Sequence, residues 1–423
     1  MNAHVIKQST AERTLAQQFA EREQREPSPV RAAAFARFAA AGLPTRRVEA
    51  WHYTDLRASM SEAAPILAAP KQDDIEAARS RLSGGERFGA GPQLVFLGGR
   101  FIAKLSDPLP AGVSIAEGSV AARPIDDALA ALNEALSPTG WTISVAQGFK
   151  VTEPITLLHL GGAASSYSVY SRMALALGAG AQASFVEIFE GAHAGVQRHA
   201  STILTLADSA IAKHVVVVGD EPGLHVETQI FELAKSAELT AFGLVSGGKL
   251  TRRQIFVRIA GDRAKVSLGG LALIEGVRRA DTTLQVVHTA PACASREFYR
   301  AIVDDDAVGV FQGKVIVEQA AQKTDGSMKS QAILLSPRAQ MNEKPELEIF
   351  ADDVVCGHGA TVASLDPEHI FYLESRGIAN SDAKAMLLEA FGEESIARIE
   401  DKSLADPLRA RLAAWLDARK VRP

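Results

Sequence analysis

A cysteine and a histidine stand two residues apart in the C-terminal part of the chain, separated by one glycine. In an extended strand, Cys356 and His358 project from the same face, because side chains alternate with a period of two. A thiolate beside an imidazole suits iron, zinc or copper. Two ligands do not close a metal site, so the others must come from elsewhere in the chain or from a partner. The alternative interpretation is a buried structural cysteine with a hydrogen-bonded histidine near a chain bend.

Other polar residues are weaker candidates for chemistry. Cys293 lies among alanines, where a cysteine is usually a small apolar filler. The run Asp304–Asp306 could bind a cation, although a solvated turn is the more ordinary role. Three histidines are expected to be plain core or surface residues: His199, His214 and His225. No glycine-rich phosphate loop followed by Lys-Ser or Lys-Thr occurs, so the chain is not expected to hydrolyse ATP.

Length and composition exclude several classes of protein. The 423 residues suit two or three domains, or one elongated domain with helical appendages. The chain has 45 Lys and Arg against 50 Asp and Glu, a balance that does not favour a nucleic-acid partner. No stretch approaches the roughly 18 apolar residues of a membrane-spanning helix, and no signal peptide is recognisable. Because the sequence has two cysteines, reducing cytoplasm is the expected location, with no membrane partner.

Residues 93–350 have the pattern of strands. Short β-branched runs such as 202–206, 213–218 and 254–259 are bounded by Gly, Asp or Ser, and no long helical pattern interrupts them. Small turn-like clusters end in alanines spaced by 29, 27 and 27 residues: Ala181, Ala210, Ala237 and Ala264. Such a period favours stacked coils, as in a parallel β-helix, although a β-sandwich could show similar spacing.

The two ends of the chain have helical patterns. Ser28-Pro29 predicts a helix start that Gly42 ends, and a further helix is expected over 73–82. Asp366-Pro367 predicts another start, and Asp406-Pro407 predicts the start of the last helix. We therefore expect an N-terminal helical region (1–92), a β-helix core (93–365) and a C-terminal helical region (366–423).

Several motifs of the chain resemble a known family. The C-terminal motifs lie at 344–349, 351–354, 356–361 and 371–378, and upstream motifs lie at 311–315 and 319–325. In content and order they are similar to the SufB/SufD family, the scaffold of the SUF iron–sulfur cluster assembly system. Residues 42–45 and 49–56 look like the SufD branch. Residues 339–342 lack the cysteine that SufB-type chains carry just before the following strand, which points to the same branch.

The resemblance implies both a fold and partners. The fold would be mainly β, a right-handed parallel β-helix flanked by N-terminal and C-terminal α-helical regions. The chain would be a non-catalytic scaffold subunit that forms a β-helix heterodimer with a SufB-type subunit. Its C-terminal helices would dock a SufC-type ABC ATPase. The sequence leaves open whether the isolated chain forms a homodimer, in which the β-helix edge that normally meets the partner would pair with a second copy.

The resemblance also gives a role to the cysteine–histidine pair. His358 would lie at the interface with the partner, where nascent clusters are built, and Cys356 matches the neighbouring cysteine of the family. The iron or iron–sulfur cluster would be transient and shared between the subunits. No tightly bound cofactor is expected in the isolated chain.

Two rival functions remain open from the sequence. A β-helix polysaccharide lyase or hydrolase would need converging carboxylates, for which Asp304, Asp305 and Asp306 are the candidates. A purely structural scaffold would never contact iron.

Overall fold

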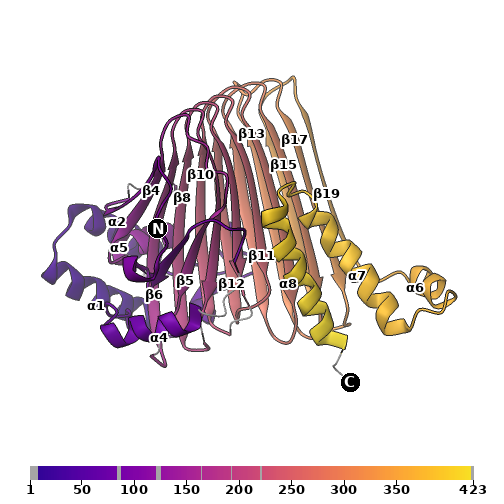
Figure 1. Cartoon of the computed structure of the whole chain (residues 1–423), viewed down its shortest axis with the longest axis horizontal. Helices are drawn as coiled ribbons and strands as arrows, with labels where there is room; N and C mark the ends of the chain where they lie inside the picture. Colours follow the sequence, from indigo (N-terminus) through magenta and orange to yellow (C-terminus); the bar gives the residue numbers. More distant parts are fainter. Residues whose placement is uncertain are drawn as a thin grey trace, which may run out of the picture.

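The strands form two large sheets that face each other, as the computed structural model shows (Figure 1). It describes residues 8–82, 87–120, 125–162, 164–191, 193–219 and 222–420. The first sheet, here the odd sheet, consists of β1 (Gln93–Leu97), β2 (Arg100–Phe101), β5 (Ile155–Leu160), β7 (Gln182–Glu190), β9 (Ile211–Val218), β11 (Glu238–Val245), β13 (Lys265–Ile274), β15 (Ala294–Val303), β17 (Asp325–Leu334) and β19 (Val355–Ala363). The second, the even sheet, consists of β3 (Val113–Gly118), β4 (Gly140–Val145), β6 (Tyr167–Leu177), β8 (Val196–Leu206), β10 (Leu224–Leu233), β12 (Leu250–Ile259), β14 (Arg279–His288), β16 (Val308–Val317) and β18 (Gln340–Ile349).

The chain passes alternately between the two sheets, so each coil contributes one strand to each. Strand pairing is parallel along both stacks, for example Leu239 of β11 beside Val266 of β13. Among the described strands, the antiparallel pairs are β1–β2 and β3–β4, at the start of the stack. This arrangement is a parallel β-helix, which confirms the fold expected from the repeat and rules out the β-sandwich.

The alanine repeat marks one corner of the coils. Each alanine of the repeat is fully buried, and the residue before it has a positive φ: Gly180, Ser209, Ser236 and Arg263. The backbone N–H of each of these residues donates to a carbonyl of the next coil, as Ser209 does to Lys235. Cys293 follows Ala292, which also has a positive φ, so the cysteine continues the buried alanine column.

The N-terminal helices lie on both sheets. Those on the outer face of the even sheet are α1 (Thr10–Arg25), α2 (Pro29–Ala41) and α3 (Leu56–Ser59), with a 3₁₀ turn η1 (Glu49–Trp51). Helix α4 (Gln72–Leu82) instead packs on the odd sheet, where Ala78 joins the cluster of Val95 and Leu158. Ser28 caps α2, Pro29 is its first residue and Gly42 ends it with a positive φ, as predicted. One helix was not expected: α5 (Ala128–Leu136), capped by Asp127, interrupts the strand region and packs against α2. A further 3₁₀ turn, η2 (Ala103–Leu105), follows β2.

A buried ion pair pins the N-terminal region to the β-helix. Arg252 Nη1 of β12 lies 2.6 Å from Asp281 Oδ2 of β14, and Arg252 Nη2 donates to the carbonyl oxygen of Ala50 at 2.6 Å. The guanidinium lies over the Trp51 ring, 4.2 Å from its centre. The Thr54 hydroxyl also donates to Asp281. The motif at 49–56 therefore has a docking role in this fold.

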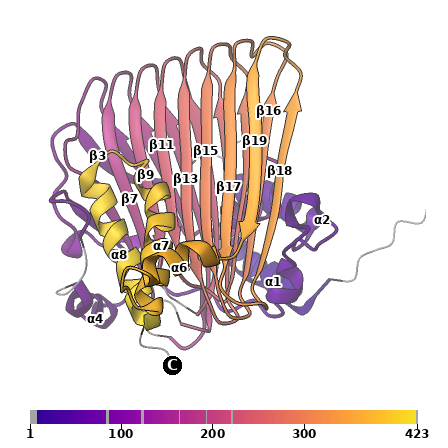
Figure 2. The same cartoon turned by 90° about the vertical axis from the view of Figure 1, so that its right-hand side faces the viewer.

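The C-terminal helices lie on the outer face of the odd sheet (Figure 2). They are α6 (Pro367–Glu374), α7 (Asn380–Ile396) and α8 (Lys402–Lys420). Apolar residues of α7 and α8 pack on outward side chains of the strands, and none of the described helices is long and apolar enough to cross a membrane. The side chains of α6 are all at least partly exposed, and this helix extends away from the strands (Figure 1).

The predicted start of the last helix at Asp406-Pro407 is wrong. α8 begins at Lys402, where Asp401 Oδ1 accepts from the backbone N–H of Ser403. Pro407 therefore lies inside the helix and removes one hydrogen bond, a change that typically costs about 3 kcal/mol. Leu404 and Ala405, before the proline, are fully buried against the sheet, and this packing offsets the loss.

Candidate functional site

The cysteine–histidine pair lies on the last strand of the odd sheet. Cys356 and His358 both belong to β19, so the extended conformation expected for them is confirmed. In the parallel register Cys356 lies beside Gly326 of β17, and His358 lies beside Met328. Met328 is fully buried in the core between the sheets, so both members of the pair lie over its open end.

This last coil is open to solvent. Among the described strands, β19 pairs with β17 alone and β18 with β16 alone, so each leaves a backbone edge unpaired. His358 is exposed, Cys356 is half-buried, and the imidazole makes no hydrogen bond or ion pair within the described residues. Large apolar side chains are exposed beside them, with Val355 at 74% and Phe350 at 62%. An exposed apolar surface along an unpaired edge is typical of an interface.

The Cys356 thiol faces inward, toward acidic groups. Burial raises its pKa, and the nearby carboxyls of Asp325 and Glu297 raise it further, although the Gly326 backbone N–H opposes the shift. The thiol is therefore held protonated until a cation or another positive group arrives.

Glu297 of β15 is a buried carboxyl without a partner. Its side chain is 1% exposed, and neither carboxyl oxygen accepts a hydrogen bond within the described residues. Burial raises its pKa to about 8, although Ser295 and Arg296 oppose the shift. Glu343 of β18 differs, because its Oε1 accepts from the Ser330 hydroxyl at 2.9 Å, and burial raises its pKa to about 7.

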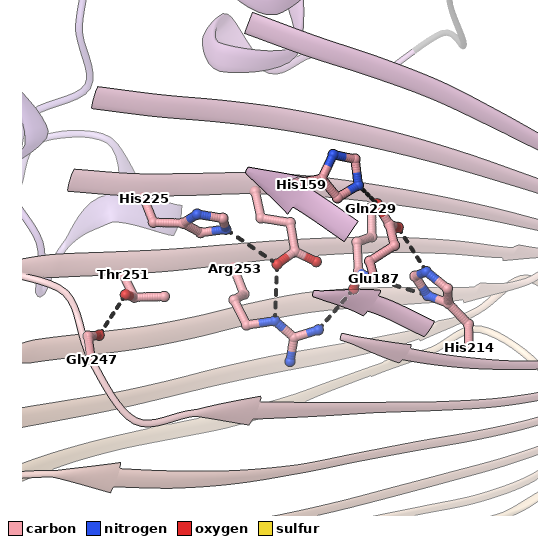
Figure 3. Close-up of polar contacts among 9 residues, drawn as sticks. His159, Glu187, His214, His225, Gln229, Gly247, Thr251 and Arg253 are labelled. Atoms are coloured by element: carbon pink, nitrogen blue, oxygen red, sulfur yellow. Dashed lines mark hydrogen bonds and ion pairs between the residues drawn. The ribbon is translucent and has the colours of Figure 1, made fainter. Parts of the chain in front are cut away.

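A second polar group lies deeper in the β-helix (Figure 3). Glu187 of β7 accepts from His159 Nε2 at 3.1 Å and from His214 Nε2 at 2.8 Å. Burial would raise the pKa of Glu187, but the two histidines bring it well below its usual range. The Gln229 side chain links the His214 ring to Arg253, whose Nη2 donates to Gln229 Oε1 at 3.0 Å.

The chain of contacts continues through Arg253. Arg253 Nε lies 3.4 Å from Glu227 Oε2, and the same carboxylate lies 3.6 Å from His225 Nε2. All these side chains are buried, so the cluster is closed to solvent. We call it the Glu187 cluster: His159, Glu187, His214, His225, Glu227, Gln229 and Arg253.

The structure places the remaining candidates in structural roles. Cys293 is buried in the alanine column, and His199, His214 and His225 are all buried in the fold, as expected. Asp304, Asp305 and Asp306 do form a turn, but each carboxylate has a separate partner: Arg419, the backbone N–H of Gly276, and Arg338. The three carboxylates do not converge, so they do not form the acid pair that a polysaccharide lyase or hydrolase would need. Within the described part of the chain, no three His, Cys, Asp or Glu side chains are arranged to hold a metal ion.

Sequence reasoning missed Glu297 and the Glu187 cluster. Alternation within a strand separates two faces, but it does not tell which face is inside when both carry apolar residues. The alanine column could have settled this. Glu297 lies an even number of residues after Cys293, and Glu187 an even number after Ala181, so both point inward like those residues.

Comparisons with known proteins agree with this fold and motif set. Residues 159–391 match the family model described as the SUF system FeS cluster assembly, SufBD core domain. The chain is 31% identical to the iron–sulfur cluster assembly protein SufD of Escherichia coli, over 89% of this chain and 90% of that protein. It is 29% identical to an iron–sulfur cluster assembly SufBD family protein of Synechocystis, over 87% and 86% of the two chains.

A plant relative is more distant. The chloroplastic protein ABCI7 of Arabidopsis thaliana is 27% identical over 66% of this chain and 61% of that protein. The match to the bacterial SufD extends over nearly the whole of both chains, including the N-terminal region outside the core domain. The chain belongs to the SufB/SufD family of the SUF iron–sulfur cluster assembly system, and within it resembles SufD.

Proposed function

We propose that this chain is a non-catalytic scaffold subunit of an iron–sulfur cluster assembly complex, and that clusters are built where its last coil meets a SufB-type subunit. The observation that carries the proposal is the position of the pair. Cys356 and His358 lie on β19, a strand with one unpaired edge and exposed apolar neighbours. A partner that covers this edge would supply the ligands that the chain lacks.

The iron or nascent cluster is the cargo of this site. His358 offers an exposed imidazole, and Cys356 offers a thiol two residues away on the same face. Because the two side chains cannot complete a tetrahedral site, the cargo is bound transiently and shared with the partner. In this account the chain assists iron acquisition, and it holds no cofactor tightly when isolated.

The C-terminal helices are the proposed dock for a SufC-type ABC ATPase. Helix α6 exposes Phe371 at 72% and Tyr372 at 56%, and it extends beyond the strands. The ATPase would supply the hydrolysis, and movement of α6–α8 would change access to the last coil. The region 366–423 would then act as one docking unit beside the core at 93–365 and the N-terminal region at 1–92. The complex would work in the cytoplasm.

Co-purification of the three subunits tests the partners. The tagged chain is co-expressed with a SufB-type and a SufC-type subunit, and the recovered subunits are identified by mass. Phe371→Asp should lose the ATPase and keep the second scaffold, since a charge on α6 disrupts an apolar contact. Phe350→Asp, a matched change beside the last coil, should lose the SufB-type scaffold and keep the ATPase.

The two variants control for each other. Both substitute an exposed phenylalanine, so neither should unfold the chain. If each variant recovers both partners at wild-type ratios, the two proposed surfaces are wrong, whatever the iron content of the complex.

A further inference from the structure

An unfilled space lies beside Cys356 inside the last coils. In the register of the odd sheet, Gly326 stands between Cys356 of β19 and Ser295 of β15. A Cβ atom at Gly326 would lie 3.3 Å from Cys356 Sγ and 3.7 Å from Ser295 Oγ. Since glycine has no Cβ, the thiol and the hydroxyl border one space, which we call the Gly326 slot.

Two buried polar side chains lie near this slot. Ser295 is fully buried, and its hydroxyl makes no well-formed hydrogen bond within the described residues, although it faces the Glu297 carboxyl and opposes the rise in the pKa of that group. Glu297 lies two residues further along the same face of β15, neither of its carboxyl oxygens has a well-formed hydrogen bond, and its charge raises the pKa of the Cys356 thiol. A buried polar group without a partner is destabilising, and a cation that binds it removes this penalty.

The slot contrasts with two other carboxyls of the last coils, each of which has at least one partner. Glu343 Oε1 accepts from the Ser330 hydroxyl, although Glu343 Oε2 has no partner within the described residues, and Asp304 is paired with Arg419. Glu297 is the one whose strand also carries an unpartnered hydroxyl bordering the Cys356 thiol. Sulfur and carboxylate oxygen together are ligands for a divalent transition metal.

We propose that the Gly326 slot is an inner cation site, in which Cys356 Sγ, the Glu297 carboxylate and the Ser295 hydroxyl hold a divalent transition metal ion. This inference rests on the proposed function. It adds a position at which iron enters, deeper between the sheets than the exposed side chain of His358. Binding is a ligand exchange without redox change: the metal ion replaces the thiol and carboxyl protons, which pass to the solvent. With two anionic ligands, the site is weak and suits cargo in transit.

Cobalt binding to the whole purified chain tests the proposal. Co²⁺ is titrated into the reduced protein, and the sulfur-to-cobalt charge-transfer absorption reports binding at a thiolate. Wild type should develop this band, and Cys356→Ser should not. Glu297→Gln keeps the shape of the side chain and should weaken Co²⁺ binding by about 10- to 100-fold, as loss of a ligand-shell residue commonly does. Gly326→Ala should also weaken it, because the added Cβ occupies the slot.

Three control variants separate this site from its alternatives. Glu343→Gln removes a half-buried carboxyl that is not among the atoms bordering the slot, and Cys293→Ser removes the other thiol, so both should bind Co²⁺ like wild type. His358→Ala should also keep the band, because the imidazole belongs to the interface site and is not a ligand in the Gly326 slot.

Two results would overturn the inner site. The first is an unchanged Co²⁺ affinity in Glu297→Gln, and the second is the absence of the band in wild type. If His358→Ala abolishes the band while Glu297→Gln does not, the interface site stands and the inner site is wrong. Thermal unfolding of each variant verifies that its fold is intact.

Discussion

The β-helix interior contains two polar regions whose buried carboxyls differ in their hydrogen-bond partners and in the direction of their pKa shifts. In the Glu187 cluster, the carboxylate accepts from two histidines, and its pKa is well below the usual range. In the last coils, Glu297 has no hydrogen-bond partner within the described residues, and its pKa is raised to about 8. Both side chains are equally buried, so the difference lies in their partners and not in their depth.

The comparison indicates which region is poised for chemistry. The Glu187 carboxylate is enclosed and already accepts from two histidines, so a further ligand would stabilise it little, and the Glu187 cluster specifies the packing of the middle coils. An unpaired buried carboxyl beside an inward-facing thiol is strongly stabilised when a cation binds between them. The free edge of β19 and the unpartnered imidazole of His358 belong to the same end of the stack. Partner binding and metal binding therefore converge on the last coil.

The largest expected effect on stability comes from substitution of Glu187, the paired carboxylate. Glu187→Leu leaves the rings of His159 and His214 buried without their acceptor. Breaking a buried pair from one side should lower the free energy of unfolding by about 3–5 kcal/mol. Urea unfolding followed by circular dichroism measures it. A loss below about 1 kcal/mol, within the range of ordinary substitutions, would mean that the two buried histidines do not depend on Glu187 as their acceptor.

The matching change at the unpaired carboxyl should have the opposite sign. Glu297→Leu removes an unsatisfied buried group among apolar neighbours such as Leu268 and Met328. The free energy of unfolding should rise by about 1–3 kcal/mol, the penalty of such a group. The same urea experiment applies. A clear destabilisation would show that Glu297 has a partner in the folded chain.

The pH dependence of stability should also separate the two carboxyls. Glu297 has a raised pKa in the folded state, so between the unfolded pKa of about 4.3 and about 8 the folded state binds the extra proton. Wild type should therefore lose stability relative to Glu297→Gln as the pH rises through this window. Glu187 has a lowered pKa, so its contribution should instead be lost as the pH falls below about 4. Melting temperatures of wild type and each Gln variant at pH 2 to 8 measure both trends, and parallel curves would contradict them.

The smallest expected effect on stability is at His358. Its side chain is exposed and unpartnered, so His358→Ala should change the free energy of unfolding by no more than about 0.5 kcal/mol. A larger loss would favour the structural interpretation of the cysteine–histidine pair over the functional one.

The sequence predicted those features that recur or that follow from local chemistry. The corner alanines gave the period of the coils, because a position repeated in every coil must remain small. Ser28, Pro29 and Gly42 placed α2 correctly, since capping depends on a few neighbouring residues. The family resemblance supplied the parallel β-helix, which the repeat alone had left open against a sandwich.

Features that depend on tertiary contacts were not predicted. The Asp406-Pro407 signal was overridden because burial of Leu404 and Ala405 extends α8 to an earlier cap. Helix α5 was missed because its nine residues lie inside a long region with the pattern of strands, although its Ala- and Leu-rich sequence and the Asp127 cap are helix signals. The isolation of Glu297 depends on which side chains surround it in neighbouring coils, and those coils are about 30 residues away along the chain.

The most direct test of the account is the iron and sulfide content of the reconstituted three-subunit complex carrying His358→Ala. The control is His52→Ala, an exposed histidine in the N-terminal region that belongs to neither β18 nor β19. The account predicts that His358→Ala retains both partners but loses labile iron and sulfide, while His52→Ala matches wild type. Wild-type iron and sulfide in the His358→Ala complex would contradict it and favour a scaffold that never contacts iron.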